Sequence, residues 1–351
     1  MINCFRKYAL FLVVFIHSHL NMTYYFDVSV PSFLVNCYGY VLGYFHPASI
    51  LAAISGYLLF KSFDCSDKNW RSSFNGKYIK RIYSLLIPYV FWISLFFIFN
   101  NLLIYFIRHF NTNVFVSEFN SLTPSNYIKS FFYPELALAK HLWYLNNLLF
   151  VFIIAPLLLV VSKNKPAFII LLFLIGLYYY LTYNRSASEH DIIIRYRFIL
   201  FFVIGTFLGL NKNYFDFIAQ HRLVLFMLFI GAFIVLNSSI YYNPDKGFLY
   251  LINNFIVNIL VFLLFFILLK RFYKREATIY NKSNHFLLYI IHPIILSVLC
   301  KILLHTHIIS INKYFVLLII CFVLTFLVVK INDFIYSFLN KKFAGFTRRF
   351  L

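Results

Sequence analysis

Charged residues are scarce in this sequence, and their scarcity excludes an ordinary soluble globular chain. Only 12% of the 351 residues are Asp, Glu, Lys or Arg, whereas soluble domains carry about 25%. Hydrophobic residues make up 62% and aromatic residues 22%, which is more apolar surface than a soluble core can bury. Such a chain has to place its segments in lipid, where open sheet edges are not tolerated. The predicted fold class is therefore an all-α integral membrane protein.

Cysteines and linker segments are also few. The five cysteines are an odd number and are scattered along the chain, which indicates neither a disulfide framework nor a metal site. No Gly/Ser-rich or Pro-rich stretch divides the sequence, so we predict one membrane domain over residues 1–351. The first apolar run continues to Phe26 without a small-x-small cleavage site, and we expect it to be a retained helix.

Apolar stretches long enough to cross a bilayer recur along the chain. A spanning helix needs about 20 mostly apolar residues, and we predict about ten spans. They cover roughly residues 8–26, 38–60, 82–105, 143–162, 167–183, 196–210, 223–242, 248–269, 285–304 and 314–336. Within them, the glycine pairs Gly39/Gly43 and Gly205/Gly209 have the spacing that lets helices pack closely, although this spacing also arises by chance.

Lysine and arginine follow the predicted topology. Of these residues, about 22 fall in loops on one side of the map and about 9 on the other, so the positive-inside rule places both termini in the cytoplasm. The formal net charge of +20 sits at the ends of apolar segments. We therefore expect a lipid bilayer as the partner of these cations and no nucleic acid.

Ionisable residues inside predicted spans are candidates for chemistry, because a charge at the centre of a span costs about 2.5–3.5 kcal/mol. Arg6 and His17 are eleven residues apart, which is about three helical turns, so they share one face with His17 about 16 Å deeper. This arrangement suits an anionic donor that enters from the cytoplasm. Alternatively, Arg6 only sets topology and a neighbouring helix satisfies His17.

A second histidine falls in the ninth predicted span. His292 lies about 10 Å past the start of that helix, and Tyr289 precedes it on much the same face. The pair is either functional or structural. In the structural interpretation, Pro293 kinks the helix and His292 bonds a carbonyl group that the proline leaves without a donor.

A basic cluster, Lys77, Lys80 and Arg81, leads into Pro88 at the start of the third predicted span. It would place positive charge at the cytoplasmic mouth of the helix bundle. These cations either bind an anionic ligand or act only as the strongest positive-inside element.

Five strings, in order along the chain, resemble the acyltransferase family 3 integral membrane proteins, a group of bacterial O-acyltransferases. The first string is an arginine, ten residues and a histidine, which Arg6 and His17 match. The others are Ser55–Gly56–Tyr57–Leu58–Leu59, the run KRIYSLLIPY with Lys80 and Arg81, His141–Leu142–Trp143–Tyr144–Leu145, and YIIHP with Tyr289 and His292. No string is specific alone, but five in matching order are.

The sequence also departs from the family pattern in three places. Asn3 replaces an aspartate that often precedes the arginine, and Ala52 and Ala53 replace an aromatic pair before the Ser-Gly string. Leu148 stands where one version of the fourth-helix string has glutamate.

The resemblance implies an O-acetyltransferase of the bacterial inner membrane, which moves an acetyl group from cytosolic acetyl-CoA to a hydroxyl of a surface polysaccharide or lipid-linked glycan, without a metal. It implies His17 and Arg6 as the catalytic pair, with His17 acting as a base or relaying the acyl group. Arg81, Lys80 and Lys77 would bind the phosphates of coenzyme A. Further site candidates are His292, Tyr289, Trp143, His141 and Ser55.

Two other functions fit a basic, aromatic-rich chain of many helices. One is a transporter or flippase of lipid-linked saccharides, and the other is a catalytically silent scaffold of a glycan-assembly complex. Neither function requires the five ordered strings, whereas an acyltransferase of this family does.

Overall fold

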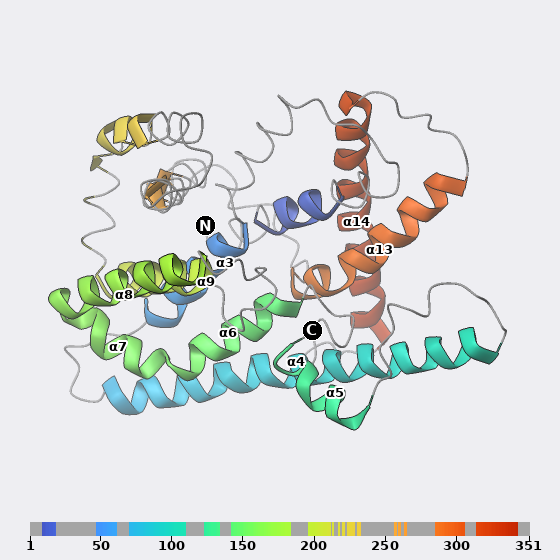
Figure 1. Ribbon diagram of the computed structural model, residues 1–351, viewed down its shortest axis with the longest axis horizontal. Coiled ribbons are helices and arrows are strands. Elements are labelled where there is room, and N and C mark those ends of the chain that lie inside the picture. Colours follow the sequence, from blue (N-terminus) through green and yellow to red (C-terminus); the bar gives the residue numbers. More distant parts are fainter. Residues whose placement is uncertain are drawn as a thin grey trace.

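The computed structural model describes ten parts of the chain. These are residues 9–18, 47–61, 70–109, 123–133, 142–183, 196–211, 285–305 and 314–342, with some residues between 213 and 232 and between 256 and 264. Helix is the only regular secondary structure in these parts, so the all-α prediction is confirmed for them. The helices are Ala9–Ser18, α3 (Pro47–Phe60), α4 (Trp70–His109), α5 (Pro124–Ser130), α6 (Trp143–Ile153), α7 (Ala155–Lys163), α8 (Lys165–Tyr183), α9 (Tyr196–Leu210), α13 (His285–His305) and α14 (Tyr314–Lys342) (Figure 1).

Several helices coincide with predicted spans, and two do not. The bounds of α9 are those of the predicted span 196–210, and α8 and α13 agree with their spans within two residues. By contrast, α4 begins at Trp70, so the basic cluster lies within the helix and not before it. The predicted span 143–162 is divided into α6 and α7, which are bent by 61°. The predicted spans 223–242 and 248–269 lie largely outside the described residues.

Two of the described helices are long and apolar enough to cross a membrane. They are Tyr78–Phe99 within α4 and Ile319–Lys342 within α14, and the bent pair of α6 and α7 makes a third if it counts as one span. The other apolar helices in the described residues are shorter. About ten spans and cytoplasmic termini therefore stay predictions.

The apolar window of α4 is little buried. Only 17% of its most apolar 18-residue stretch is buried inside the protein. Ile79, Tyr83, Leu86 and Val90 are all exposed and recur three or four residues apart on one stripe. A soluble protein rarely exposes so continuous an apolar stripe, whereas lipid would cover it.

Helices α3 and α9 pack more extensively than any other pair of described helices. A Cβ atom built on Gly205 would collide with the backbone carbonyl of Ala53, and one on Gly209 would come within 2.8 Å of the carbonyl oxygen of Tyr57. The prediction that Gly205 and Gly209 allow close packing is thus confirmed, while Gly39 and Gly43 lie outside the described residues. Both contacts advance by four residues along each helix, so α3 and α9 run parallel, as the predicted map requires.

The small residues of α3 belong to this contact. Ala52 and Ala53 are both 0% exposed, and an aromatic ring at Ala53 would push α9 away. Without side chains beyond Cβ, the two backbones gain van der Waals contact, which drives helix association where lipid removes the hydrophobic effect. Alanines in place of the family's aromatic pair therefore leave room for α9 to approach α3 closely.

Helix α4 bonds one end of α6 directly and is linked to the other end through the residues that follow α5. The Tyr78 hydroxyl donates to the carbonyl of Ile153, at the bend between α6 and α7, with a donor–acceptor distance of 3.2 Å. Near the other end of α6, Asn146 donates to the carbonyl of Phe132 at 2.8 Å, and the Tyr89 hydroxyl donates to the adjacent carbonyl of Phe131 at 2.8 Å. The start of α6 thus lies level with Tyr89, the middle of the apolar window Tyr78–Phe99.

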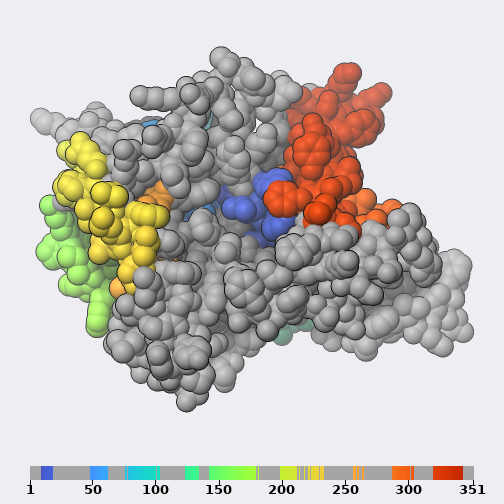
Figure 2. All heavy atoms as spheres, turned by 90° about the horizontal axis from the view of Figure 1, so that it is seen from above, coloured from blue at the N-terminus to red at the C-terminus, as the bar shows by residue number. Residues whose placement is uncertain are grey.

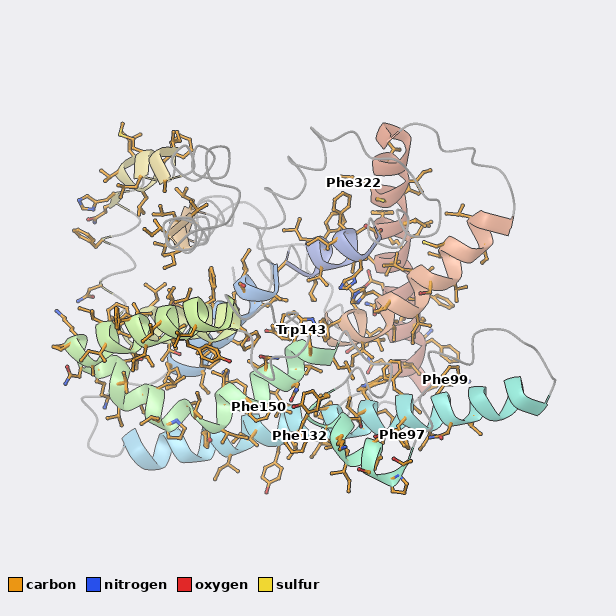
Figure 3. All side chains as sticks on the ribbon, in the orientation of Figure 1. Phe97, Phe99, Phe132, Trp143, Phe150 and Phe322 are labelled. Carbon is orange, nitrogen blue, oxygen red and sulfur yellow. The ribbon has the colours of Figure 1, made fainter. Side chains whose placement is uncertain are left out.

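The N-terminal helix Ala9–Ser18 packs against α14, which α13 also contacts (Figure 1). The rings of Phe15 and Phe322 have centroids 4.9 Å apart, and Figure 3 shows Phe322 beside this helix. The Ser18 hydroxyl donates to the carbonyl of Cys321 at 3.3 Å. The same contact is visible from above in Figure 2, where the blue N-terminal helix touches red α14.

Candidate active site

Two of the predicted site residues, from opposite ends of the chain, lie in contact. The rings of His17 in the N-terminal helix and His292 in α13 have centroids 5.1 Å apart and planes inclined by 53°. His292 is 0% exposed, and His17 is half-buried. The sequence singled out each histidine separately, and no pattern in it indicated that they meet.

The local geometry of His292 differs from the structural interpretation. Its Nδ1 atom lies 3.0 Å from the carbonyl oxygen of Leu288. The missing N–H of Pro293 leaves a different carbonyl without its helical donor, that of Tyr289. His292 is therefore held by the preceding turn of its own helix, through a carbonyl other than the one that proline leaves without a donor.

Aromatic rings and one hydroxyl pair continue the cluster toward α6 and α3. The ring of Tyr289 lies 6.2 Å from that of His292 and 5.6 Å from that of Tyr144, centroid to centroid. The Tyr144 hydroxyl in turn lies 3.3 Å from the Ser55 hydroxyl of α3. Tyr289, His292 and Ser55, predicted separately, thus belong to one cluster.

Tyr144 joins this cluster but was not among the predicted site residues. It contacts Ser55, Tyr289, Trp143 and Phe198. Its neighbour Trp143, labelled at the start of α6 in Figure 3, packs edge-on against Phe198 of α9. The only sequence signal for Tyr144 was its place in the string that also contains His141 and Trp143.

Arg81 of the basic cluster lies at the end of α3. Nη2 of Arg81 donates to the carbonyl of Leu58, in the last turn of α3, at 3.2 Å. A cation at the C-terminal end of a helix is favoured by the helix dipole. Lys61, the next residue after α3, lies with its ammonium 5.4 Å from the Tyr57 ring centroid. Lys80 is exposed on α4.

Three predicted site residues are not placed with their side chains. Lys77 lies in α4, but its side chain is outside the described set, and Arg6 and His141 lie outside the described residues altogether. Whether Arg6 shares a face with His17 stays a prediction. In the described residues, no group of three His, Cys, Asp or Glu side chains could hold a metal ion.

The buried His292 and the half-buried His17 between apolar helices, together with exposed apolar helical surfaces, define a membrane protein with a polar site among its helices. Residues 2–330 match the acyltransferase domain family, and the chain belongs to acyltransferase family 3. It is therefore a membrane acyltransferase. No curated protein and no solved structure matches the chain.

Proposed function

We propose that this protein is an O-acetyltransferase of the bacterial inner membrane. It moves the acetyl group of cytosolic acetyl-CoA to a hydroxyl of a surface polysaccharide or a lipid-linked glycan. The family membership supports acyl transfer, and the acetyl donor and the glycan acceptor are the proposal's own step.

The contact between His17 and His292 is the observation that carries the proposal. Ionisable side chains among apolar helices are costly and mark functional sites by default. Here two of them come from helices more than 270 residues apart in sequence, and both lie inside the matched family region. A general base next to a second polar group is the arrangement that acyl transfer to a hydroxyl needs.

His17 acts as the base in this proposal. It takes the proton of the acceptor hydroxyl as the oxygen attacks the thioester carbonyl, and it gives this proton to the thiolate of coenzyme A when the C–S bond breaks. Arg81, Lys80 and Lys77, with Arg6, bind the phosphates of the donor. The bond from Nη2 of Arg81 to the carbonyl of Leu58 is compatible with this role, because a guanidinium has five N–H donors.

The test is His17→Ala, followed in membranes that contain the cell's own glycan. An apolar residue replaces a polar group in lipid, so the variant should insert normally, while acetyl transfer should fall by about 10²- to 10⁴-fold. Mass spectrometry of the surface glycan and release of the coenzyme A thiol from acetyl-CoA measure the loss.

A displaced histidine serves as the control. Ile16→His in the His17→Ala background turns the ring about 100° around the helix and should not restore activity. Full turnover per inserted molecule in His17→Ala would remove the catalytic assignment and favour a flippase of lipid-linked saccharides, which needs no base and releases no thiol.

A further inference from the structure

His292 contacts the proposed base His17 but has no role of its own in the proposed reaction, which uses only one base. The two ring centroids are 5.1 Å apart and the ring planes are inclined by 53°, so the two imidazoles are direct neighbours. His292 is 0% exposed, in contrast to the half-buried His17. The more accessible ring is therefore the one that a substrate hydroxyl can reach.

The helix determines which nitrogen of His292 carries the proton of the neutral ring. Nδ1 lies 3.0 Å from the carbonyl oxygen of Leu288, and a carbonyl oxygen can only accept a hydrogen bond. Nδ1 is therefore the donor. A neutral imidazole has one donor and one acceptor nitrogen, so Nε2 is the acceptor, and α13 holds the ring in this tautomer.

A catalytic histidine is usually oriented by a third group, most often a carboxylate. In the described part of the chain, Asp333 is the only acidic residue. Next to His17 in sequence, Ser18 meets α14 at Cys321 and Thr325. Asp333 lies eight residues beyond Thr325, about 12 Å along the helix. Among the described residues, the titratable side chain next to His17 is thus the imidazole of His292 and not a carboxylate.

We propose that His292 is the positioning residue of His17 in the acetyl transfer, an inference that rests on the proposed function. The acceptor oxygen forms a C–O bond to the thioester carbonyl carbon, and its proton passes to His17. Nε2 of His292 accepts a hydrogen bond from the resulting imidazolium and stabilises its charge among apolar helices. The C–S bond then breaks, the thiolate takes the proton from His17, and both rings are neutral again.

Asparagine and glutamine at position 292 separate this role from a structural one. The amide of His292→Asn replaces the Nδ1 side of the ring and can keep the bond to Leu288. The amide of His292→Gln reaches to the position of Nε2 and offers His17 an acceptor. If His292 positions His17, Gln retains more activity than Asn. The opposite order would show that only the bond to Leu288 matters and would overturn the proposal.

Loss of the residue that orients His17 should lower kcat without abolishing activity. We expect His292→Ala and His292→Asn to lower kcat for release of coenzyme A thiol by about 10- to 100-fold. The KM for acetyl-CoA should stay the same, since His292 does not contact the donor in this scheme. A raised KM with an unchanged kcat would contradict the proposal.

His221 supplies a matched control. Its Nδ1 also lies on the carbonyl of the residue four positions earlier, Phe217, at 2.9 Å, but His221 is exposed and far from the site in sequence. His221→Ala should keep full activity. Melting temperature in detergent, measured for every variant, separates loss of kcat from loss of folded protein.

The double variant His17→Ala/His292→Ala decides whether the two rings act as a unit. If His292 works through His17, the double variant is no slower than His17→Ala alone. Multiplied losses would show independent roles and overturn the inference while leaving the proposed function in place. If wild-type membranes release no thiol from acetyl-CoA, the proposed function fails, and the inference falls with it.

Discussion

Replacing Gly205 by alanine tests the packing that brings α3 to the site. The added Cβ would collide with the carbonyl of Ala53, and a backbone group cannot move aside as a side chain can. Overpacking of this kind costs about 1–3 kcal/mol. Against this, alanine in a helix gains about 0.5–1 kcal/mol over glycine. The net effect depends on both contributions, so a second glycine is needed to separate them.

Gly176 of α8 is the matched control, because a Cβ atom built there has nothing within 4 Å. Gly176→Ala gains the same helix propensity without a collision, so the difference between the two variants isolates the collision, about 1–3 kcal/mol. We expect Gly205→Ala to melt at least about 2 °C below Gly176→Ala in the same detergent. Equal melting temperatures would refute the close approach of α3 and α9.

Two further predictions concern the donor side and the topology. If Arg81 binds donor phosphate, Arg81→Ala should raise the KM for acetyl-CoA in normally inserted protein, and Arg81→Lys should rescue it only in part because lysine loses bidentate geometry. An unchanged KM would show that Arg81 does not bind the donor and only bonds the C-terminal end of α3. A reporter fused after Lys163 should read cytoplasmic and one near Ser125 should read external, as the distribution of cations predicts; a cytoplasmic signal at Ser125 would refute the map and the proposed donor side together.

The fold was predictable where a local rule had no competitor. The apolar run ending at Leu210 gave the bounds of α9, and the spacing of Gly205 and Gly209 gave its packing face. Proline shows the limit of such rules, because its effect depends on the surroundings. Pro88 and Pro293 lie within continuous helices, whereas Pro156 follows the bend at Ile154 and stands in the first turn of α7. The sequence alone did not distinguish these cases.

The site was predictable as a set of residues but not as an arrangement. His17 and His292 stood out because charge is costly in a span. Tyr144 did not, since a tyrosine among 22% aromatic residues carries no such signal. The place of Tyr144 in the cluster depends on the packing of α3, which brings the Ser55 hydroxyl to the Tyr144 hydroxyl. The spacing of residues in the sequence does not predict long-range contacts of this kind.

The parallel packing of α3 and α9 also sets an order of assembly. Ala53 and Gly205 touch in the folded protein, yet their residue numbers differ by 152. At about 5–20 residues per second of synthesis, α3 emerges roughly 8 to 30 s before its partner. Helices in membranes insert first and associate afterwards. The surface of α3 around Gly56 therefore meets lipid or another helix first, and the Ser55 side of the site forms only after α9 has arrived.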